Sequence, residues 1–334
     1  MAKQTRKNGP NGATQVGRKP RVTQQRAENG NGHVEVEPSS TAAAGGARLP
    51  VLKTYKIYIA GKFPRTESGR YYLLKDARGA ALANVCLSSR KDFREAVVAA
   101  RAAQGGWAAK SAYNRGQILY RIAEMLEGRA AQFVEELTAT GSTAAAARAE
   151  VERSIDRVLY YAGWSDKYQQ IFSSVNPVAS SHFNFSLLEP TGVVSIISPE
   201  ETGLIGLIST IAPTIVGGNT CIALASTSKP LAAVTFSEVL ATSDLPGGVV
   251  NLLTGERKEL LEHFSSHMDI NACVYCGRDT SELALVRTKA ANNVKRAISY
   301  DRAGADDWMS EAAQSPYFIL DTQEVKTTWH PVGV

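Results

Sequence analysis

The spacing of apolar residues changes near residue 192 of this chain. From there on, short runs rich in Val, Ile, Leu and Cys, typical of buried strands, alternate with segments whose apolar residues recur at helical spacing. The strand-like runs are "GVVSII", "TCIALA", "VVNLLTG", "INACVYCG" and "VKRAIS". Five such runs separated by helices predict an α/β fold, a doubly wound parallel sheet covered by helices on both faces.

The preceding residues predict three helices and a small β-element. The helical segments are 90–104, 113–137 and 144–168, each with an apolar stripe on one face. Ahead of them, "TYKIYIAGKF" alternates like a strand and "RYYLLKD" is its predicted hairpin partner. With 334 residues and 44% apolar content, the chain can bury one large core or two moderate ones.

Two segments alternate polar and apolar residues outside the sheet pattern. Residues 171–190 contain two candidate strands around a turn rich in Ser, Asn and Pro, and "QEVKTTWHPVGV" near the C-terminus alternates in the same way. We expect 171–190 and 320–334 to form a projecting β-strand arm. Such an arm leaves backbone donors and acceptors free, so it is expected to pair with another chain.

The positive charge is concentrated at the N-terminus. Residues 1–48 contain eight Lys or Arg and three Glu, which accounts for the whole formal net charge of +5. This tail is nearly free of large apolar residues, so we expect it to be disordered. It suits either a solvated tail or an electrostatic arm for an acidic partner, and we do not expect nucleic acid to be the main partner. With no secretory signal and no membrane-length apolar run, a cytoplasmic protein is expected.

The four cysteines and five histidines suggest no metal site and no catalytic set. Cys273 and Cys276 form a C-x-x-C, but they lie in a strand-like run where residues three apart point to opposite faces. We therefore interpret them as structural. His263 and His267 are four residues apart without an evident third ligand, which favours a surface pair. No G-x-S-x-G nucleophile elbow occurs.

Several phrases are collinear with those of one enzyme family. They are "AVVAARAAQGGWAAKSAYNRGQILYRIAEMLEGR", "YYAGWSDKY", "EPTGVVSIISP", "IAPTIVGGNTCIAL", "DLPGGVVNLLTG", "INACVYCG" and "TQEVKTTWHPVGV". On these residues the chain resembles the aldehyde dehydrogenase superfamily, and most of all its truncated, non-catalytic members related to the second module of two-module aldehyde dehydrogenases. The resemblance implies a Rossmann-like NAD-binding-type domain over 49–170 and 191–304, with the arm serving in oligomerisation.

The turn after "GVVSII" departs from the family. There the resemblance implies Pro-Trp-Asn, in which the Asn amide donates to the oxyanion formed during aldehyde oxidation; here Pro199 is followed by Glu200 and Glu201. A carboxylate accepts hydrogen bonds and repels a developing oxyanion. Loss of one such donor costs roughly 2.7–4 kcal/mol of transition-state stabilisation. We therefore expect no working oxyanion hole.

The cofactor contacts implied by the resemblance are also changed. Leu224 stands in the place of the family's cofactor Lys, and Thr227 in that of the Glu that binds the adenosine ribose. In the phosphate turn Gly277 is kept, but Arg278 replaces a Ser and Glu282 replaces a second Gly. The residues facing this degenerate cofactor crevice are expected to be Ser198, Leu224, Gly277 and Arg278. No bound cofactor is the main expectation, and NAD or NADP binding is expected to be weak at most.

The catalytic groups implied by the resemblance have no counterpart. Tyr300 takes the place of the family's general base, and no Cys follows Cys276, whereas the family's nucleophilic Cys comes some thirty residues after the base. Residues 305–319 are interpreted as a linker that replaces the catalytic domain, and Asp306, Asp307 and Glu311 as a solvated acidic loop. Without a thiolate no covalent acyl-enzyme forms.

Three functional hypotheses remain open. The first is a non-catalytic aldehyde-dehydrogenase-like subunit, a pseudoenzyme, that assembles through the arm with a catalytic aldehyde dehydrogenase or with itself. The second is the cofactor-binding half of an aldehyde oxidoreductase that a partner chain completes. The third is a binding module acting through the basic tail.

Overall fold

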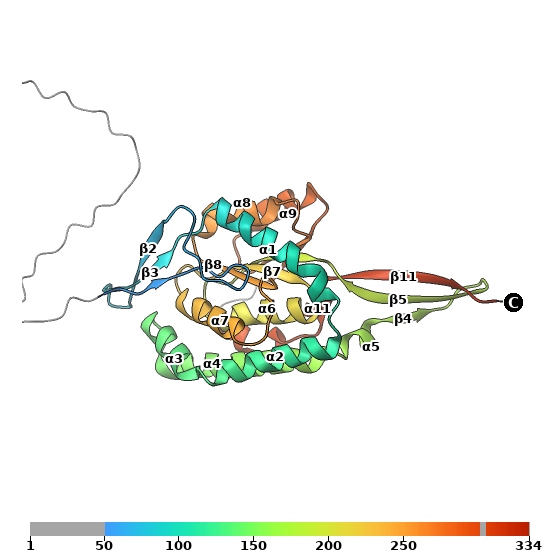
Figure 1. The fold of residues 1–334 in the computed structure, drawn as a ribbon, viewed down its shortest axis with the longest axis horizontal. Helices are drawn as coiled ribbons and strands as arrows, with labels where there is room; N and C mark the ends of the chain where they lie inside the picture. Colours follow the sequence, from blue (N-terminus) through green and yellow to red (C-terminus); the bar gives the residue numbers. More distant parts are fainter. Residues whose placement is uncertain (1–50, 301–304, 334) are drawn as a thin grey trace, which may run out of the picture. The chain divides into compact units, whose positions relative to one another are not determined.

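The computed structural model describes residues 51–300 and 305–333. The predicted basic tail, 1–48, lies outside the described residues. A five-stranded parallel sheet with strand order β10-β9-β6-β7-β8 forms the centre of the described part (Figure 1). Its strands are β6 (Val193–Ile197), β7 (Thr220–Leu224), β8 (Val250–Leu253), β9 (Ala272–Tyr275) and β10 (Arg296–Ser299). The predicted fold class is confirmed.

Every residue of β6, β7, β8 and β9 is buried, which explains the nearly continuous apolar runs in the sequence. The helices that connect the strands are α6 (Ile205–Val216), α7 (Leu231–Ala241), α8 (Arg257–Ser266) and α9 (Thr280–Ala291). Two hydrophobic clusters lie on the two faces of the sheet. One contains residues of α6 and α7, and the other contains residues of α8 and α9.

The helices before the sheet complete both layers. They are α1 (Arg90–Ala108), α2 (Ala112–Glu127), α3 (Ala130–Ala139) and α4 (Ala144–Trp164). Helix α1 packs with α8, whereas α2 and α4 pack with α6 (Figure 1). The single helix predicted over 113–137 is broken into α2 and α3, because α2 ends at the C-cap Gly128 and the chain turns before α3.

The small β-element differs from the predicted hairpin. Strand β2 (Tyr71–Lys75) pairs with β3 (Ala81–Cys86), which the sequence pattern did not reveal, and β1 (Thr54–Tyr55) pairs with the other edge of β3. The residues after β1 instead reach the edge of the large sheet, where the Tyr58 N–H donates to the Leu252 carbonyl at 2.9 Å. Burial of the 57–59 segment against β8 therefore outweighs hairpin formation.

The arm is a separate three-stranded antiparallel sheet with strand order β11-β5-β4. After the short helix α5 (Tyr168–Phe172) come β4 (Ser174–Asn176) and β5 (His182–Pro190). Strand β11 (Gln323–Pro331) pairs along the whole of β5 in an uninterrupted register. Segments far apart in the sequence thus form one ribbon that extends away from the helices (Figure 1).

The segment between β10 and β11 is a packed helical element and not the predicted loop, although the side chain of Glu311 is exposed as predicted. It forms α10 (Ala305–Met309), the 3-10 helix η1 (Glu311–Ala313) and α11 (Tyr317–Leu320). Trp308 is 1% exposed and Ile319 is fully buried, in the same core as residues of α4 and α6. In the sequence, the Asp and Glu residues interrupt the apolar residues of this short segment, so its helices were not predicted.

A buried arginine of α4 fixes this segment. The Arg157 side chain is fully buried, and its guanidinium donates to the carbonyls of Ala313 at 2.7 Å and Trp308 at 3.2 Å and to the Ser209 hydroxyl. It also donates to Gln314 Oε1 at 3.2 Å. Because an arginine offers five donors in a rigid plane, one residue satisfies several buried acceptors at once.

In the described part of the chain, no helix is long and apolar enough to cross a membrane.

Candidate functional site at the carboxyl ends of the strands

The strand order reverses between β6 and β9. From β6 the chain proceeds through β7 to β8 on one side, and β9 and β10 lie on the other side. In open parallel sheets, ligands bind in the crevice outside the carboxyl ends of the strands at such a reversal. Ser198, which follows β6, and Cys276, which follows β9, mark this crevice.

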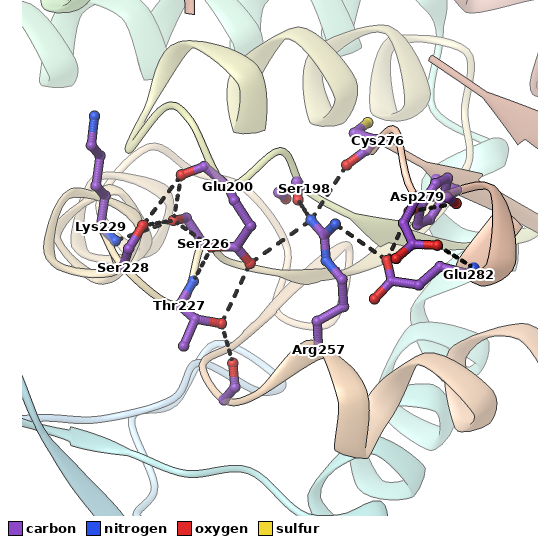
Figure 2. A network of polar contacts seen from close by, with 12 residues as sticks. Ser198, Glu200, Ser226, Thr227, Ser228, Lys229, Arg257, Cys276, Asp279 and Glu282 are labelled. Atoms are coloured by element: carbon purple, nitrogen blue, oxygen red, sulfur yellow. Dashed lines mark hydrogen bonds and ion pairs between the residues drawn. The ribbon is translucent and has the colours of Figure 1, made fainter. Parts of the chain in front are cut away.

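Arg257 lies across the crevice. It is the first residue of α8, and its Nη2 donates to the Ser198 carbonyl at 2.6 Å and to the Cys276 carbonyl at 3.3 Å. Its side chain is only 15% exposed. Figure 2 shows the guanidinium between the ends of the two strands. The positive charge therefore bridges the place where the sheet order reverses.

Glu200 lies on one side of the Arg257 guanidinium. Its carboxylate accepts from the Thr227 backbone N–H at 2.9 Å and the Ser226 hydroxyl at 3.0 Å, and its Oε1 lies 3.8 Å from Arg257 Nη2 (Figure 2). The loop after β7 thus supplies the hydrogen bonds, and Arg257 supplies the charge. Glu200 joins the ends of β6 and β7 to the start of α8.

Glu282 lies on the other side of the Arg257 guanidinium. Its Oε2 lies 3.5 Å from Arg257 Nη1 and accepts from the Tyr275 hydroxyl at 2.7 Å. Burial, followed by this hydrogen bond to Glu282, raises the pKa of Tyr275. Arg257 is therefore flanked by two carboxylates from different elements (Figure 2).

The N-terminus of α9 is capped from within the chain. Asp279 Oδ1 accepts from the backbone N–H groups of Ser281 at 2.8 Å and Glu282 at 3.1 Å. The Ser281 hydroxyl also donates to Asp279 Oδ1, and this hydrogen bond, followed by the two from the backbone, lowers the pKa of Asp279. A helix N-terminus is a natural anion site because its first amides lack partners. Here a side-chain carboxylate already uses two of them.

The four residues predicted to face the crevice have different surroundings. Ser198 is 3% exposed and its hydroxyl has no hydrogen-bond partner among the described residues. Leu224 ends β7 with its side chain 1% exposed, within the hydrophobic core. Gly277 follows Cys276, and the adjacent Arg278 is exposed.

The glycine kept at 277 has a local steric reason. A Cβ at this position would lie 2.6 Å from the Tyr275 hydroxyl and 2.9 Å from Arg257 Nη1. Both contacts are shorter than van der Waals separation, so either side chain would have to move. Gly277 therefore gives Arg257 room to reach the strand ends.

The turn that carries Glu200 and Glu201 leads into a second capped helix. Glu150 of α4, 7% exposed, accepts from the backbone N–H groups of Leu204 at 2.8 Å and Ile205 at 3.1 Å at the start of α6. The Glu201 carbonyl accepts from Lys229 Nζ at 2.8 Å. Two helix N-termini near the strand ends are thus neutralised by carboxylates of this chain.

Arg257 and Glu150 were not singled out from the sequence, although each leaves a signal. Arg257 is a cation in the first turn of a predicted helix, where the helix dipole disfavours it. Glu150 shares the buried face of α4 with Val151 and Ser154. A charged residue at a position that disfavours charge indicates a hydrogen-bond or ion-pair partner from a distant part of the chain.

The cysteines offer no accessible thiol. All four cysteines of the sequence lie in the described part of the chain, where they are buried and form no disulfide. Burial raises the pKa of Cys273 to about 11 and also raises that of Cys221. The structural interpretation of Cys273 and Cys276 agrees with this burial. The described residues contain no cluster of metal-ligating side chains.

Tyr300, in the position of the expected general base, faces the segment before β11. Its hydroxyl donates to Asp321 Oδ2 at 2.7 Å, and its ring packs on Phe318 with centroids 4.5 Å apart. Burial raises the pKa of Tyr300, and the neighbouring Asp321 raises it further. Tyr300 therefore connects the end of β10 to the segment that leads into β11, which we call the base of the arm.

A doubly wound sheet with a crevice at its topological reversal defines a dinucleotide-binding type of fold. Comparison with known proteins identifies the family: the chain belongs to the aldehyde dehydrogenase family, whose model matches residues 63–303.

Individual relatives agree with this assignment. The cytosolic 10-formyltetrahydrofolate dehydrogenase of Mus musculus is 30% identical over 264 residues, which cover 77% of this chain and 29% of the relative. The 2-hydroxymuconic semialdehyde dehydrogenase of Pseudomonas sp. (strain CF600) is 29% identical, over 76% of this chain and 53% of the relative. The crystal structure of HpcC from Thermus thermophilus superposes with a TM-score of 0.71 at 26% identity, covering 74% of this chain and 48% of that chain. The chain thus spans about half or less of the length of these relatives.

Proposed function

We propose that this chain is a non-catalytic aldehyde-dehydrogenase-like subunit whose arm assembles it with an aldehyde dehydrogenase chain or with a second copy of itself. The observation that supports the proposal is Arg257, which lies across the strand reversal and donates to the carbonyls that follow β6 and β9. The place where the fold would receive a dinucleotide is taken by the chain's own side chain.

A dinucleotide does not fit the groups around this crevice. A pyrophosphate there would meet the carboxylates of Glu200 and Glu282, which already neutralise Arg257. Like charges at such short range in a partly buried site are strongly unfavourable. The amides of α9 that favour phosphate are used by Asp279.

The chemistry of aldehyde oxidation also lacks its groups. Glu200 and Glu201 stand where an amide donor is needed for the oxyanion, and the four cysteines are buried. A thiol whose pKa is raised by burial is a poor nucleophile at neutral pH.

Activity measurements on the purified chain test the non-catalytic part of the proposal. With millimolar NAD or NADP and a panel of aldehydes, we expect no NADH or NADPH formation and no calorimetric signal for cofactor binding. A catalytic aldehyde dehydrogenase prepared in the same way serves as the control. NADH formation at a rate proportional to the concentration of this chain would contradict the proposal.

Co-purification tests the assembly part. The chain is purified alone and together with a catalytic aldehyde dehydrogenase from the same source, and the molar masses of the eluted species are measured by light scattering. We expect an assembly larger than one chain in at least one of the two preparations. A chain that stays monomeric in both would refute the assembly role.

A further inference from the structure

The first turn of α1 contains an arginine with no partner among residues 51–300 and 305–333. Arg90 is the first residue of α1, where the helix dipole disfavours a positive charge. Arg257 has the same position in α8, but its guanidinium is bound by carbonyls and flanked by carboxylates. The guanidinium of Arg90 forms no hydrogen bond or ion pair in the described part of the chain, and neither does that of Arg94. Both side chains are exposed, and because they are four residues apart they lie on one face of the helix.

Two histidines of α8 lie next to this face. Helices α1 and α8 pack against each other (Figure 1). Phe93, which lies between Arg90 and Arg94 in the sequence, makes an edge-to-face contact with His267, with ring centroids 5.8 Å apart. His267 is the C-cap residue of α8, and His263 lies one turn before it. Two guanidinium groups and two imidazoles are thus brought together from two helices.

A lysine adds further positive charge beside His267. Lys295 is 8% exposed, and its Nζ donates to the His267 carbonyl at 2.7 Å. Burial lowers the pKa of Lys295 to about 8. A carbonyl satisfies a hydrogen bond of the ammonium group but does not neutralise its charge.

The carboxylates of this region do not neutralise the cluster. Asp92 is buried and caps the N-terminus of α1. Glu262 pairs with Lys289 at 2.6 Å. Asp269 lies near His267, but within the described residues its carboxylate forms no ion pair. The region therefore has an excess of positive charge over negative charge.

The two imidazoles respond to this excess. Burial lowers the pKa of both His263 and His267. The positive charges that lower it further are Arg90 for both rings, and Lys295 and Arg94 for His267. The negative charges that oppose this are Glu262 for His263 and Asp269 for His267. A bound anion would favour the protonated imidazoles and relieve the repulsion among the cations.

We propose that Arg90, Arg94, His263 and His267 form a binding site for a phosphate dianion, either free phosphate or the phosphate group of a small monoester. Guanidinium forks match phosphate oxygens with pairs of charge-assisted hydrogen bonds. A phosphate group offers more acceptor oxygens and more negative charge than a carboxylate, which suits a cluster of four donor side chains. The ten residues of α8 separate this site from Arg257 by about 15 Å along the helix, so it is distinct from the crevice at the strand ends.

Calorimetric titration of the full chain tests the site, with inorganic phosphate and glycerol 3-phosphate as separate probes at constant ionic strength. We expect one site per chain with a dissociation constant below about 1 mM for at least one probe. Tighter binding of inorganic phosphate identifies free phosphate as the preferred ligand, and tighter binding of glycerol 3-phosphate identifies a monoester. Arg90→Gln and Arg94→Gln should each raise the dissociation constant roughly tenfold, because each removes a charged donor.

Lys91→Gln is the matched control. It removes the same charge from the same turn of α1, but Lys91 pairs with Glu67 at 2.7 Å. We expect it to change the dissociation constant by less than about threefold. Arg94→Lys keeps the charge without the planar fork, and binding should fall between that of the wild type and that of Arg94→Gln. Unchanged urea midpoints of all four variants show that the fold is intact.

Proton NMR of the histidine rings provides a second readout. Saturating phosphate should raise the pKa of His263 and His267 by about one unit each, because the bound anion favours the charged imidazoles. The resonances of His182 and His330, which lie in the arm, serve as internal controls and should not respond.

The inference is overturned if neither probe binds at millimolar concentration, or if Lys91→Gln weakens binding as much as Arg90→Gln does. It is also overturned if the pKa of His263 and His267 does not change when phosphate binds. None of these results bears on aldehyde oxidation or on assembly through the arm. The inference and the proposed function therefore fail independently.

Discussion

Two regions of the molecule, the crevice at the carboxyl ends of the strands and the outer edge of β11, have backbone N–H or C=O groups that no neighbouring strand in the described part of the chain binds. The two regions differ in what binds these groups. In the crevice, the carbonyls of Ser198 and Cys276 are bound by Arg257, which is itself flanked by Glu200 and Glu282. Along β11, the outward backbone groups have no strand partner among the described residues. In the crevice, side chains of this chain bind the strand ends, whereas no strand of the described residues covers the outer edge of β11.

The largest expected effect comes from releasing the segment that joins the two regions. Arg157→Met leaves the carbonyls of Ala313, Trp308 and Ser310 without their charged donor, so we expect a loss of about 3–5 kcal/mol in the free energy of unfolding. Urea denaturation measures this loss. Hydrogen exchange should increase in β11 more than in β6.

The matched control is Arg121→Met, whose ion pair with Glu124 has both side chains 49% exposed. It should change stability by no more than about 0.5 kcal/mol. Equal losses for the two variants would mean that Arg157 does not hold the joining segment.

The next effect concerns the filled crevice. Arg257→Met removes the donor to two strand ends and leaves two carboxylates without their cation, so we expect a loss of about 2–3 kcal/mol in urea denaturation. Because the arm does not use Arg257, the molar mass of the assembly measured by light scattering should stay at the wild-type value. A coupled loss of the assembly would show that crevice and arm are not independent.

A smaller effect separates the two sides of β11. The Val332 N–H donates to the Ser181 carbonyl at 3.0 Å, and hydrogen-bonded residues alternate along an antiparallel strand, so the even-numbered residues of β11 bond to β5. Thr328→Pro removes an N–H that bonds to β5, so we expect a loss of about 1–3 kcal/mol, whereas Thr327→Pro should cost less than about 1 kcal/mol. Thermal or urea denaturation of the two variants side by side measures the difference. The reverse order would mean that the outward-facing residues have been assigned to the wrong side.

The smallest effect is a pH dependence at the base of the arm. Burial raises the pKa of Asp321, while the hydrogen bond from Tyr300 and the charge of Arg296 oppose this rise. The folded state therefore binds the proton more tightly than the unfolded state, so this residue's contribution to stability is present below pH 3.8 and is lost as the pH rises through its folded pKa. Asp321→Asn should remove this decline, measured as the difference between urea midpoints of variant and wild type from pH 3 to pH 7. A difference that stays constant over this range would contradict the assignment.

Local pattern was sufficient for the sheet and insufficient for the site. The segments that form β6 to β9 are almost continuously apolar and alternate with helical segments. This pattern is sufficient to predict a parallel sheet. Arg257 could not be assigned in this way, because its partners lie 59 and 19 residues away in the sequence. The same applies to β3, whose residues alternate weakly and whose pairing depends on both β1 and β2.

The sequence by itself determined the alternation of strands and helices and the presence of two acidic residues, Glu200 and Glu201, in the turn after β6, because these follow from residue type and local spacing. Only the tertiary structure decided that Arg257 bridges the ends of β6 and β9, that Arg157 binds the segment after β10, and that one edge of β11 has no strand partner among residues 51–300 and 305–333. Each of these depends on groups from distant segments meeting at hydrogen-bonding distance, and that proximity is created by packing around the core.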